Sequence, residues 1–142
     1  MLEFALVLNA IWFGMGFRSF YLRRADFAKV IVTNPDHRQN TAYDCLVETG
    51  RFLGGFNFAS CVLNILMVFN VGGFASGRQW AVLLIFNALA HASQFVGNIP
   101  IAMQNRQGGG AWQVFEFPML RIFVGDLVLA VLNMALVVWC LM

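Results

Sequence analysis

The sequence predicts an all-α polytopic membrane protein, a four-transmembrane-helix bundle with a short interfacial amphipathic helix after the first span. Of the 142 residues, 60% are hydrophobic, against about 45 to 50% in ordinary soluble chains. Only 11% are charged, against about 25% in soluble domains, so ionic groups could not cover a water-facing surface. Four apolar stretches also reach the roughly 20 residues that a helix needs to cross about 30 Å of hydrocarbon.

These stretches place the spans at about residues 2–22, 46–70, 80–101 and 117–141, within a single transmembrane domain of residues 1–142. Backbone groups in hydrocarbon must hydrogen-bond internally, which leaves helices or a closed barrel. Long apolar runs without alternation exclude the barrel. We expect the first stretch to be retained as a helix, because it opens with Glu3, lacks a basic start and has no small-residue cleavage site.

The connection after the first span predicts the amphipathic helix. Phe27, Val30 and Ile31 recur at i, i+3 and i+4, with charged residues elsewhere around the turn. We expect this helix to stop before Asn34-Pro35, because the residue that precedes a proline is pushed out of the α conformation.

Three further signals predict helix ends and loops. Thr41 with Asp44 three residues later resembles a capping box, so the helix of the second span is expected to start near Ala42. The run of glycines at 108–110 predicts a flexible loop rather than a phosphate cradle, because no strand precedes it and no GK[ST] follows it. Pro118 suits the first turn of the fourth helix, where its missing N–H costs nothing.

Basic residues predict the orientation of the chain. The loops after the first and third spans hold Arg23, Arg24, Lys29, Arg38 and Arg106, whereas the opposite side holds Arg78 and two tails without basic residues. Lys and Arg accumulate on the untranslocated side of a membrane. We therefore expect an integral membrane protein with both basic loops in the cytoplasm and both termini on the opposite side.

Polar side chains inside the spans carry most of the functional information, because they are expensive at bilayer depth. One face of the third span holds four of them at i, i+4, i+7 and i+11: Asn87, His91, Gln94 and Asn98. Such a face cannot be turned to lipid. Depth counting at about 1.5 Å per residue places Asn57, His91 and Asp126 near the midplane. With Gln94, they are predicted to form a polar core or ligand-binding layer.

Two other sets of residues are predicted to hold the helices together. Ionisable groups at depth are costly unless paired, which predicts buried ion pairs among Glu48, Arg51, Arg121 and Asp126. Close backbone approach predicts helix packing at Gly14, Gly16, Gly50 and Gly54. The simpler interpretation of the polar residues is that they glue helices together through hydrogen bonds and have no further role.

Neither a metal nor a cofactor is predicted. His91 has no second intramembrane histidine with which to form a bis-histidine haem site, and no carboxylate lies three or four residues after it. The cysteines, Cys45, Cys61 and Cys140, lack CxxC or metal-ligand spacing and are interpreted as packing residues.

Short motifs in all four spans carry a resemblance. They are Gly14 with Arg18-Ser19-Phe20, then Arg51, Gly54, Phe56 and Ser60, then Ala88-Leu89-Ala90-His91 with Gln94, and finally Pro118-Met119-Leu120. On these residues the chain resembles the ergosterol biosynthetic protein 28 family of small four-span membrane proteins. The resemblance implies a non-catalytic role, since such proteins tether sterol C4-demethylation enzymes to one another in the endoplasmic reticulum membrane. It also implies that Arg51 and His91 are family-matching positions.

The sequence thus predicts a scaffold or accessory subunit, because it shows no nucleophile, metal or phosphate constellation and has very short extramembrane segments. The expected partners are the lipid bilayer and other integral membrane proteins in a hetero-complex, including enzymes of lipid or sterol metabolism, and not nucleic acid. One alternative is a lipid- or sterol-binding module, in which Asn57, His91 and Asp126 orient a ligand hydroxyl. The other is an isomerase or proton relay, in which His91 and Asp126 exchange protons.

Overall fold

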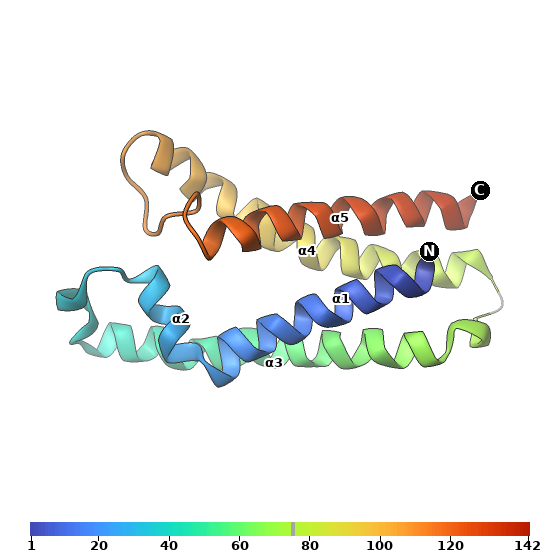
Figure 1. Cartoon of the computed structure of the whole chain (residues 1–142), viewed down its shortest axis with the longest axis horizontal. Coiled ribbons are helices and arrows are strands. Elements are labelled where there is room, and N and C mark those ends of the chain that lie inside the picture. Colours follow the sequence, from blue (N-terminus) through green and yellow to red (C-terminus); the bar gives the residue numbers. More distant parts are fainter. Residues whose placement is uncertain (75) are drawn as a thin grey trace. The chain divides into compact units, whose positions relative to one another are not determined.

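The computed structural model describes residues 1–74 and 76–142 and is all-α, which confirms the predicted fold class. Within these residues the α-helices are α1 (Leu2–Phe17), α2 (Arg24–Ile31), α3 (Thr41–Phe69), α4 (Gly77–Arg106) and α5 (Met119–Leu141) (Figure 1). A π-helical turn at Arg18–Leu22 continues α1, and 3₁₀ turns lie at Pro35–Arg38 and Val71–Gly73.

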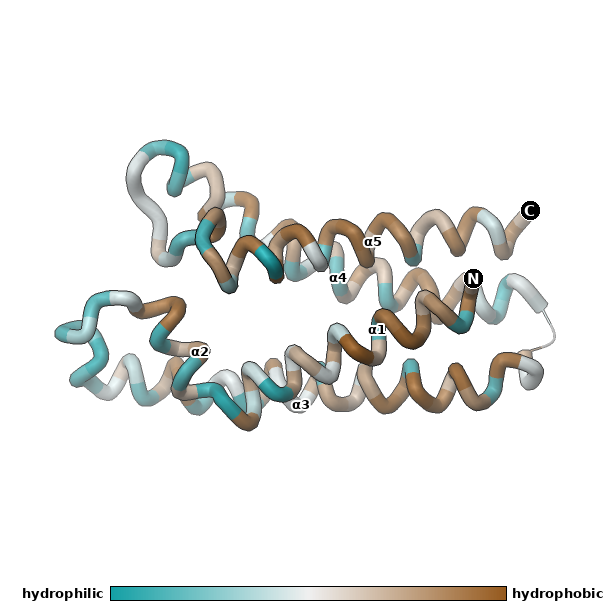
Figure 2. The backbone as a smooth tube through the Cα atoms, in the orientation of Figure 1, coloured by the Kyte–Doolittle hydropathy of each residue, from teal (hydrophilic) through white to brown (hydrophobic). Residues whose placement is uncertain are grey.

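In the described part of the chain, four helical segments are long and apolar enough to cross a membrane: Leu2–Leu22, Thr41–Phe69, Gly77–Arg106 and Met119–Leu141. Figure 2 shows hydrophobic residues along most of α1 and α5, and hydrophilic residues in the connections before α3 and after α4. Large apolar side chains are exposed, including Phe52 at 82% and Phe69 at 81%. Such surface suits lipid and would be an aggregation liability in water. The chain is therefore an integral membrane protein.

The first turn of α3 is capped differently from the prediction. The helix begins at Thr41, and the side-chain oxygen of Asn40 accepts a hydrogen bond from the backbone N–H of Tyr43 at 2.9 Å. An asparagine oxygen in this position satisfies one of the unpaired N–H groups at a helix start. The N-cap is therefore Asn40, one residue before the predicted Thr41.

The α4 helix is longer than the predicted span of residues 80–101, because it extends at both ends. At its start the backbone N–H of Ser76 donates to the side-chain oxygen of Gln79 at 3.4 Å, in a capping box. At its end the helix continues past Pro100 to Arg106. A proline removes one backbone hydrogen bond, and the remaining last turns of α4 retain theirs.

The chain divides into two compact units, which are described separately. Unit 2 is Leu6–Val68 and contains most of α1, the π-helical turn, α2 and α3. The apolar side of α2 is packed, since Ala28 is buried and the ring of Phe27 lies edge-on to that of Phe20 at 4.5 Å between centroids. The helix ends at Ile31, before Asn34-Pro35, as predicted.

Unit 1 is Met1–Ala5 with Phe69–Met142, and α4 and α5 lie side by side in it (Figure 1). Small and branched side chains form its core, namely Ala5, Ala81, Leu84, Leu136 and Val137. The rings of Phe95 and Phe123 stack between α4 and α5 with centroids 4.6 Å apart. The two helices are thus in contact along their length, which positions the polar residues considered next.

Candidate functional site

The polar face of α4 lies inside the protein, as its spacing predicts. Asn87 and His91 are 2% and 0% exposed, Asn98 is buried at 9%, and Gln94 is half-buried. Residues four or seven apart lie on one side of a helix, so burying one of them buries the others. This face therefore supplies hydrogen-bonding groups to the interior rather than to lipid.

The α5 helix also has buried polar residues, Asp126 and Asn133, which are seven residues apart and so lie on one face of the helix. Nδ1 of His91 lies 3.0 Å from Oδ1 of Asp126, and the Asp126 residue is only 3% exposed. The structure thus joins α4 to α5 through a buried imidazole and carboxyl pair.

The chemistry of this pair follows from its geometry. When Nδ1 of His91 carries a proton, it donates to the carboxylate of Asp126, which fixes the ring orientation and the tautomer. A second proton on the ring makes an ion pair, whose attraction offsets part of the cost of burying two charges. The pair can therefore hold a proton or orient a hydroxyl group, but it contains no nucleophile in the manner of a Ser or Cys site.

Four of the buried asparagines use part of their hydrogen-bonding capacity within their own helices. In each case the side-chain NH₂ donates to the backbone carbonyl four residues earlier: Asn57 to Leu53, Asn64 to Ser60, Asn98 to Gln94 and Asn133 to Leu129, at 2.8 to 2.9 Å. An asparagine amide has two donor hydrogens and one acceptor oxygen. This bond to the helix backbone lowers the free-energy cost of burying the amide, so no ligand is needed to satisfy that donor.

Sequence reasoning missed the residues that fix the loop between α4 and α5. Asn105 donates to the carbonyls of Gly109 and Trp112 at 2.8 and 2.9 Å and accepts from the N–H of Val114 at 2.7 Å. The indole N–H of Trp112 donates to the side-chain oxygen of Asn98 at 3.0 Å. This loop, predicted to be flexible, is tied to the end of α4 by both asparagines. An asparagine in the last turn of a helix before a glycine run is the signal that could have shown it.

The predicted packing glycines lie at close approaches within unit 2. A Cβ atom on Gly54 would be 2.6 Å from Cβ of Tyr21, and one on Gly50 would be 2.8 Å from the Phe20 carbonyl oxygen. A Cβ on Gly16 would overlap the side chain of Asn57. Gly14 faces the sulfur of Cys61 with ordinary contact distance. The π-helical turn therefore lies directly on α3, which is possible because Gly50 and Gly54 have no side chain there.

Of the predicted buried ion pairs, the structure forms the one between Glu48 and Arg51, but at an exposed position rather than a buried one. Glu48 pairs with Arg51 on α3 and with Arg24 from α2, and these side chains are partly exposed. The guanidinium of Arg121 lies over the ring of Phe117, at 5.6 Å from its centroid. Asp126 is brought to His91 instead, because residues five apart on one helix point about 140° away from each other.

The remaining member of the predicted polar layer is Asn57, which belongs to unit 2, where Gly16 is its neighbour. A joint layer of Asn57 with His91 and Asp126 stays a prediction. Within residues 1–74 and 76–142, no group of three or more His, Cys, Asp or Glu side chains is arranged to hold a metal ion. No protein-family model, curated protein or solved structure matches the chain.

Proposed function

We propose that the protein is a non-catalytic scaffold or accessory subunit that associates with other integral membrane proteins. The observation that carries this proposal is the hydrogen bonding of the interior. In the part of the chain that the structure describes, each buried side-chain nitrogen and oxygen already has a hydrogen-bond partner. Binding sites present convergent polar groups to a ligand, whereas here the buried polar groups are used to join and stabilise helices.

The outer surface supports the same proposal. Large side chains are exposed on every span, including Phe4 on α1, Phe52 on α3, Leu89 on α4 and Val131 on α5. Packing between transmembrane helices depends on contact area and close fit, so such surface suits a partner helix as well as lipid. We infer that partner binding occurs through the spans, because the connections between them are short.

The proposed class of partner is an enzyme of lipid or sterol metabolism. This step rests on the resemblance of the four spans to the ergosterol biosynthetic protein 28 family, with Arg51 and His91 at matching positions. Arg51 lies near the start of α3 in an ion pair with Glu48, and His91 lies buried on α4. In a scaffold, both residues would serve to hold the helices in place.

Site-specific photocrosslinking in native membranes tests the proposal. A photoreactive amino acid is placed singly at four exposed positions, namely Phe4, Phe52, Leu89 and Val131, and at the fully buried Leu84 as the control. We expect a discrete protein adduct from at least one exposed position and none from Leu84. The partner is then identified by mass spectrometry and by stoichiometric co-purification in mild detergent. Lipid adducts alone at all four positions, with a protein that purifies by itself, would overturn the scaffold proposal.

A second candidate function is favoured by the His91 and Asp126 pair. A carboxyl and an imidazole 3.0 Å apart and almost fully buried can orient a sterol or lipid hydroxyl, or pass a proton. Under this candidate, a lipid or sterol that co-purifies with the wild type is lost from His91→Leu. The exposed His37 gives the matched control, since His37→Leu should keep the ligand. Equal retention by both variants would exclude His91 from ligand binding.

A further inference from the structure

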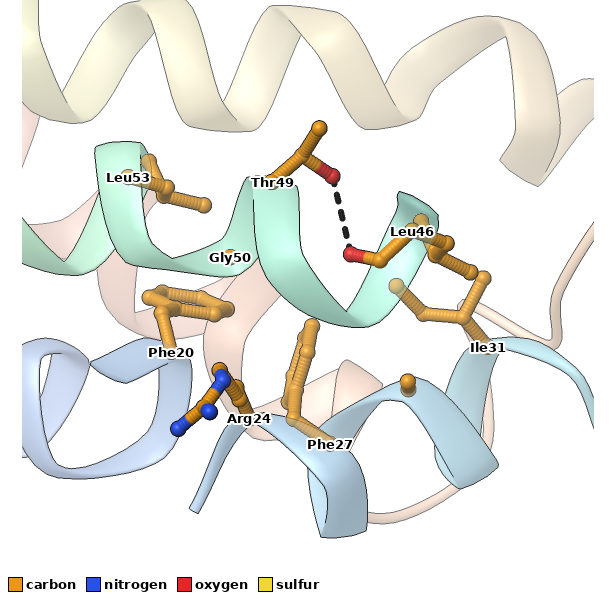
Figure 3. Close-up of a pocket in the computed structure, with 9 residues that line it drawn as sticks. Phe20, Arg24, Phe27, Ile31, Leu46, Thr49, Gly50 and Leu53 are labelled. Carbon is orange, nitrogen blue, oxygen red and sulfur yellow. Dashed lines mark hydrogen bonds between the residues drawn. The ribbon is translucent and has the colours of Figure 1, made fainter. Parts of the chain in front are cut away.

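A small cavity lies in unit 2, where the π-helical turn and α2 meet the first turns of α3 (Figure 3). Its volume is about 130 Å³. Apolar side chains make up most of the lining, namely Phe20, Phe27, Ile31, Leu46 and Leu53, and Arg24 is the charged residue among those that line it. Figure 3 shows the rings of Phe20 and Phe27 on one side of the cavity, facing α3.

The interior of the cavity is apolar for a structural reason. Gly50 contributes no side chain, and the hydroxyl of Thr49 donates to the carbonyl of Leu46 at 2.8 Å rather than into the cavity. An apolar cavity of comparable size, about 150 Å³, stays dry and takes up small hydrocarbons. Hydrocarbon is therefore the matched occupant here.

The depth of the cavity in the membrane follows from the length of α3. This helix has 29 residues. At about 1.5 Å per residue it is about 44 Å long and exceeds the roughly 30 Å hydrocarbon core. Leu46, about 7.5 Å from the start of α3, therefore lies near the boundary between the acyl chains and the headgroups, and Leu53, about 18 Å from the start, lies deeper among the chains. A lipid of the adjoining leaflet can reach both the cavity and the charged residues beside it.

Two groups of charged residues lie on the segments that form the cavity, and Arg24 of one group lines the cavity itself. Glu48 is paired with both Arg24 and Arg51. Asp26 is paired with both Arg23, at 2.9 Å, and Lys29, at 3.6 Å. Each group places two cations on one carboxylate and so keeps one positive charge. A phosphodiester with one negative charge complements this excess, and a zwitterionic headgroup does so less well.

We propose that this cavity and the Arg24, Glu48 and Arg51 group form a binding site for one anionic phospholipid. The part of an acyl chain next to its ester group fills the apolar cavity, and the phosphate lies beside the guanidinium groups of Arg24, which lines the cavity, and of Arg51. The site is separate from the buried His91 and Asp126 pair. It does not depend on the scaffold proposal, since lipid binding here needs no protein partner.

Lipid discs that contain equal amounts of phosphatidylglycerol and phosphatidylcholine test the site. The full chain is released from them, and its bound lipid is identified by native mass spectrometry. We expect phosphatidylglycerol to be enriched over phosphatidylcholine, and each of Arg24→Gln and Arg51→Gln to reduce the enrichment about fivefold. Arg78→Gln removes a positive charge at the start of α4 and should leave the enrichment unchanged.

A cavity-filling variant separates the site from general surface attraction. Ala28 lines the cavity and is buried, so Ala28→Phe fills it while every charge is kept. We expect this variant to lose the tightly bound lipid. Ala59→Phe adds the same ring to an exposed position of α3 and should retain it. If Ala28→Phe folds and binds phosphatidylglycerol as the wild type does, the proposal is wrong.

The wild-type chain provides a test that does not depend on any variant. Phosphatidylglycerol with a photoreactive group next to the ester of one acyl chain is added in the same discs. We expect its adducts to concentrate in residues 20–31 and 46–53. Adducts spread evenly over the four spans would overturn the proposal. Displacement of the bound lipid by millimolar inorganic phosphate would also overturn it, because the site would then recognise the anion without the chain.

Discussion

The two units of the molecule hold their helices together by different means. In unit 1, α4 and α5 share a buried polar pair, His91 with Asp126. In unit 2, the π-helical turn rests on α3 where Gly50 and Gly54 have no side chain. Lipid gives helices no hydrophobic reason to associate, so polar bonds and close packing are the two available means. The stability of unit 1 should therefore depend on the polar groups of its buried side chains. The stability of unit 2 should depend on the small size of the residues where the turn meets α3.

The largest effect is expected from removing one member of the polar pair. Asp126→Leu removes the carboxyl group and leaves His91 facing an apolar side chain. Removing one partner of a buried pair typically costs about 3 to 5 kcal/mol, so we expect a loss of that size in the free energy of unfolding. The measurement is unfolding of the purified chain in mixed micelles of mild detergent and dodecyl sulfate.

The matched control for this prediction is the double variant His91→Leu with Asp126→Leu. Replacing both members of a buried pair by apolar residues is often neutral. We therefore expect the double variant to be more stable than Asp126→Leu alone. A double variant that is no more stable than Asp126→Leu would show that the two residues do not act as a pair.

A smaller effect in unit 2 should come from adding one methyl group. A Cβ on Gly54 would lie 2.6 Å from Cβ and 2.7 Å from the backbone nitrogen of Tyr21. Overpacking of this kind costs about 1 to 3 kcal/mol, so Gly54→Ala should destabilise unit 2 by that amount. The same unfolding measurement gives the value.

The neighbouring glycine provides the control within the same helix. A Cβ on Gly55 meets no atom within 4 Å. Since alanine favours a helix over glycine, Gly55→Ala should stabilise α3 by up to about 1 kcal/mol. The opposite signs of two adjacent substitutions are the distinguishing result. The same sign for both would mean that close packing at Gly54 is not what holds the turn on α3.

The sequence predicted the fold well because length and hydropathy are properties of each segment alone. Four spans follow from this, and the end of α2 before Asn34-Pro35 follows from local sterics. The inward direction of the α4 face could also be predicted, because a spacing of four and seven residues defines a face without knowledge of its neighbour.

The partners within the site were harder to predict, because spacing along one helix does not show which residue of another helix lies opposite. Asp126 was a candidate partner of Arg51 and Arg121 as well as a member of the layer with His91, and the structure pairs it with His91. The hydrogen bonds of Asn105 to the loop were missed for a similar reason. They join a side chain to backbone groups of the loop, so the position of Asn105 before the glycine run indicates such bonds, but the sequence does not show which backbone groups they reach.

The smallest effect concerns the exposed charged side chains of α2. A hydrogen bond from Arg23, and then the charge of Arg23, lower the pKa of Asp26 below its usual 3.8. A lowered pKa means that the folded protein favours the carboxylate. Its stabilising contribution is therefore complete above about pH 4 and is lost as the pH falls through the lowered value.

Nuclear magnetic resonance titration of the Asp26 carboxyl measures this directly. Arg23→Gln should raise the pKa of Asp26 back toward 3.8, because it removes the two largest causes of the shift. Lys29→Gln should raise it less, since Lys29 lies 3.6 Å away and contributes less to the shift. If Lys29→Gln had the larger effect, Asp26 would be held mainly by the lysine.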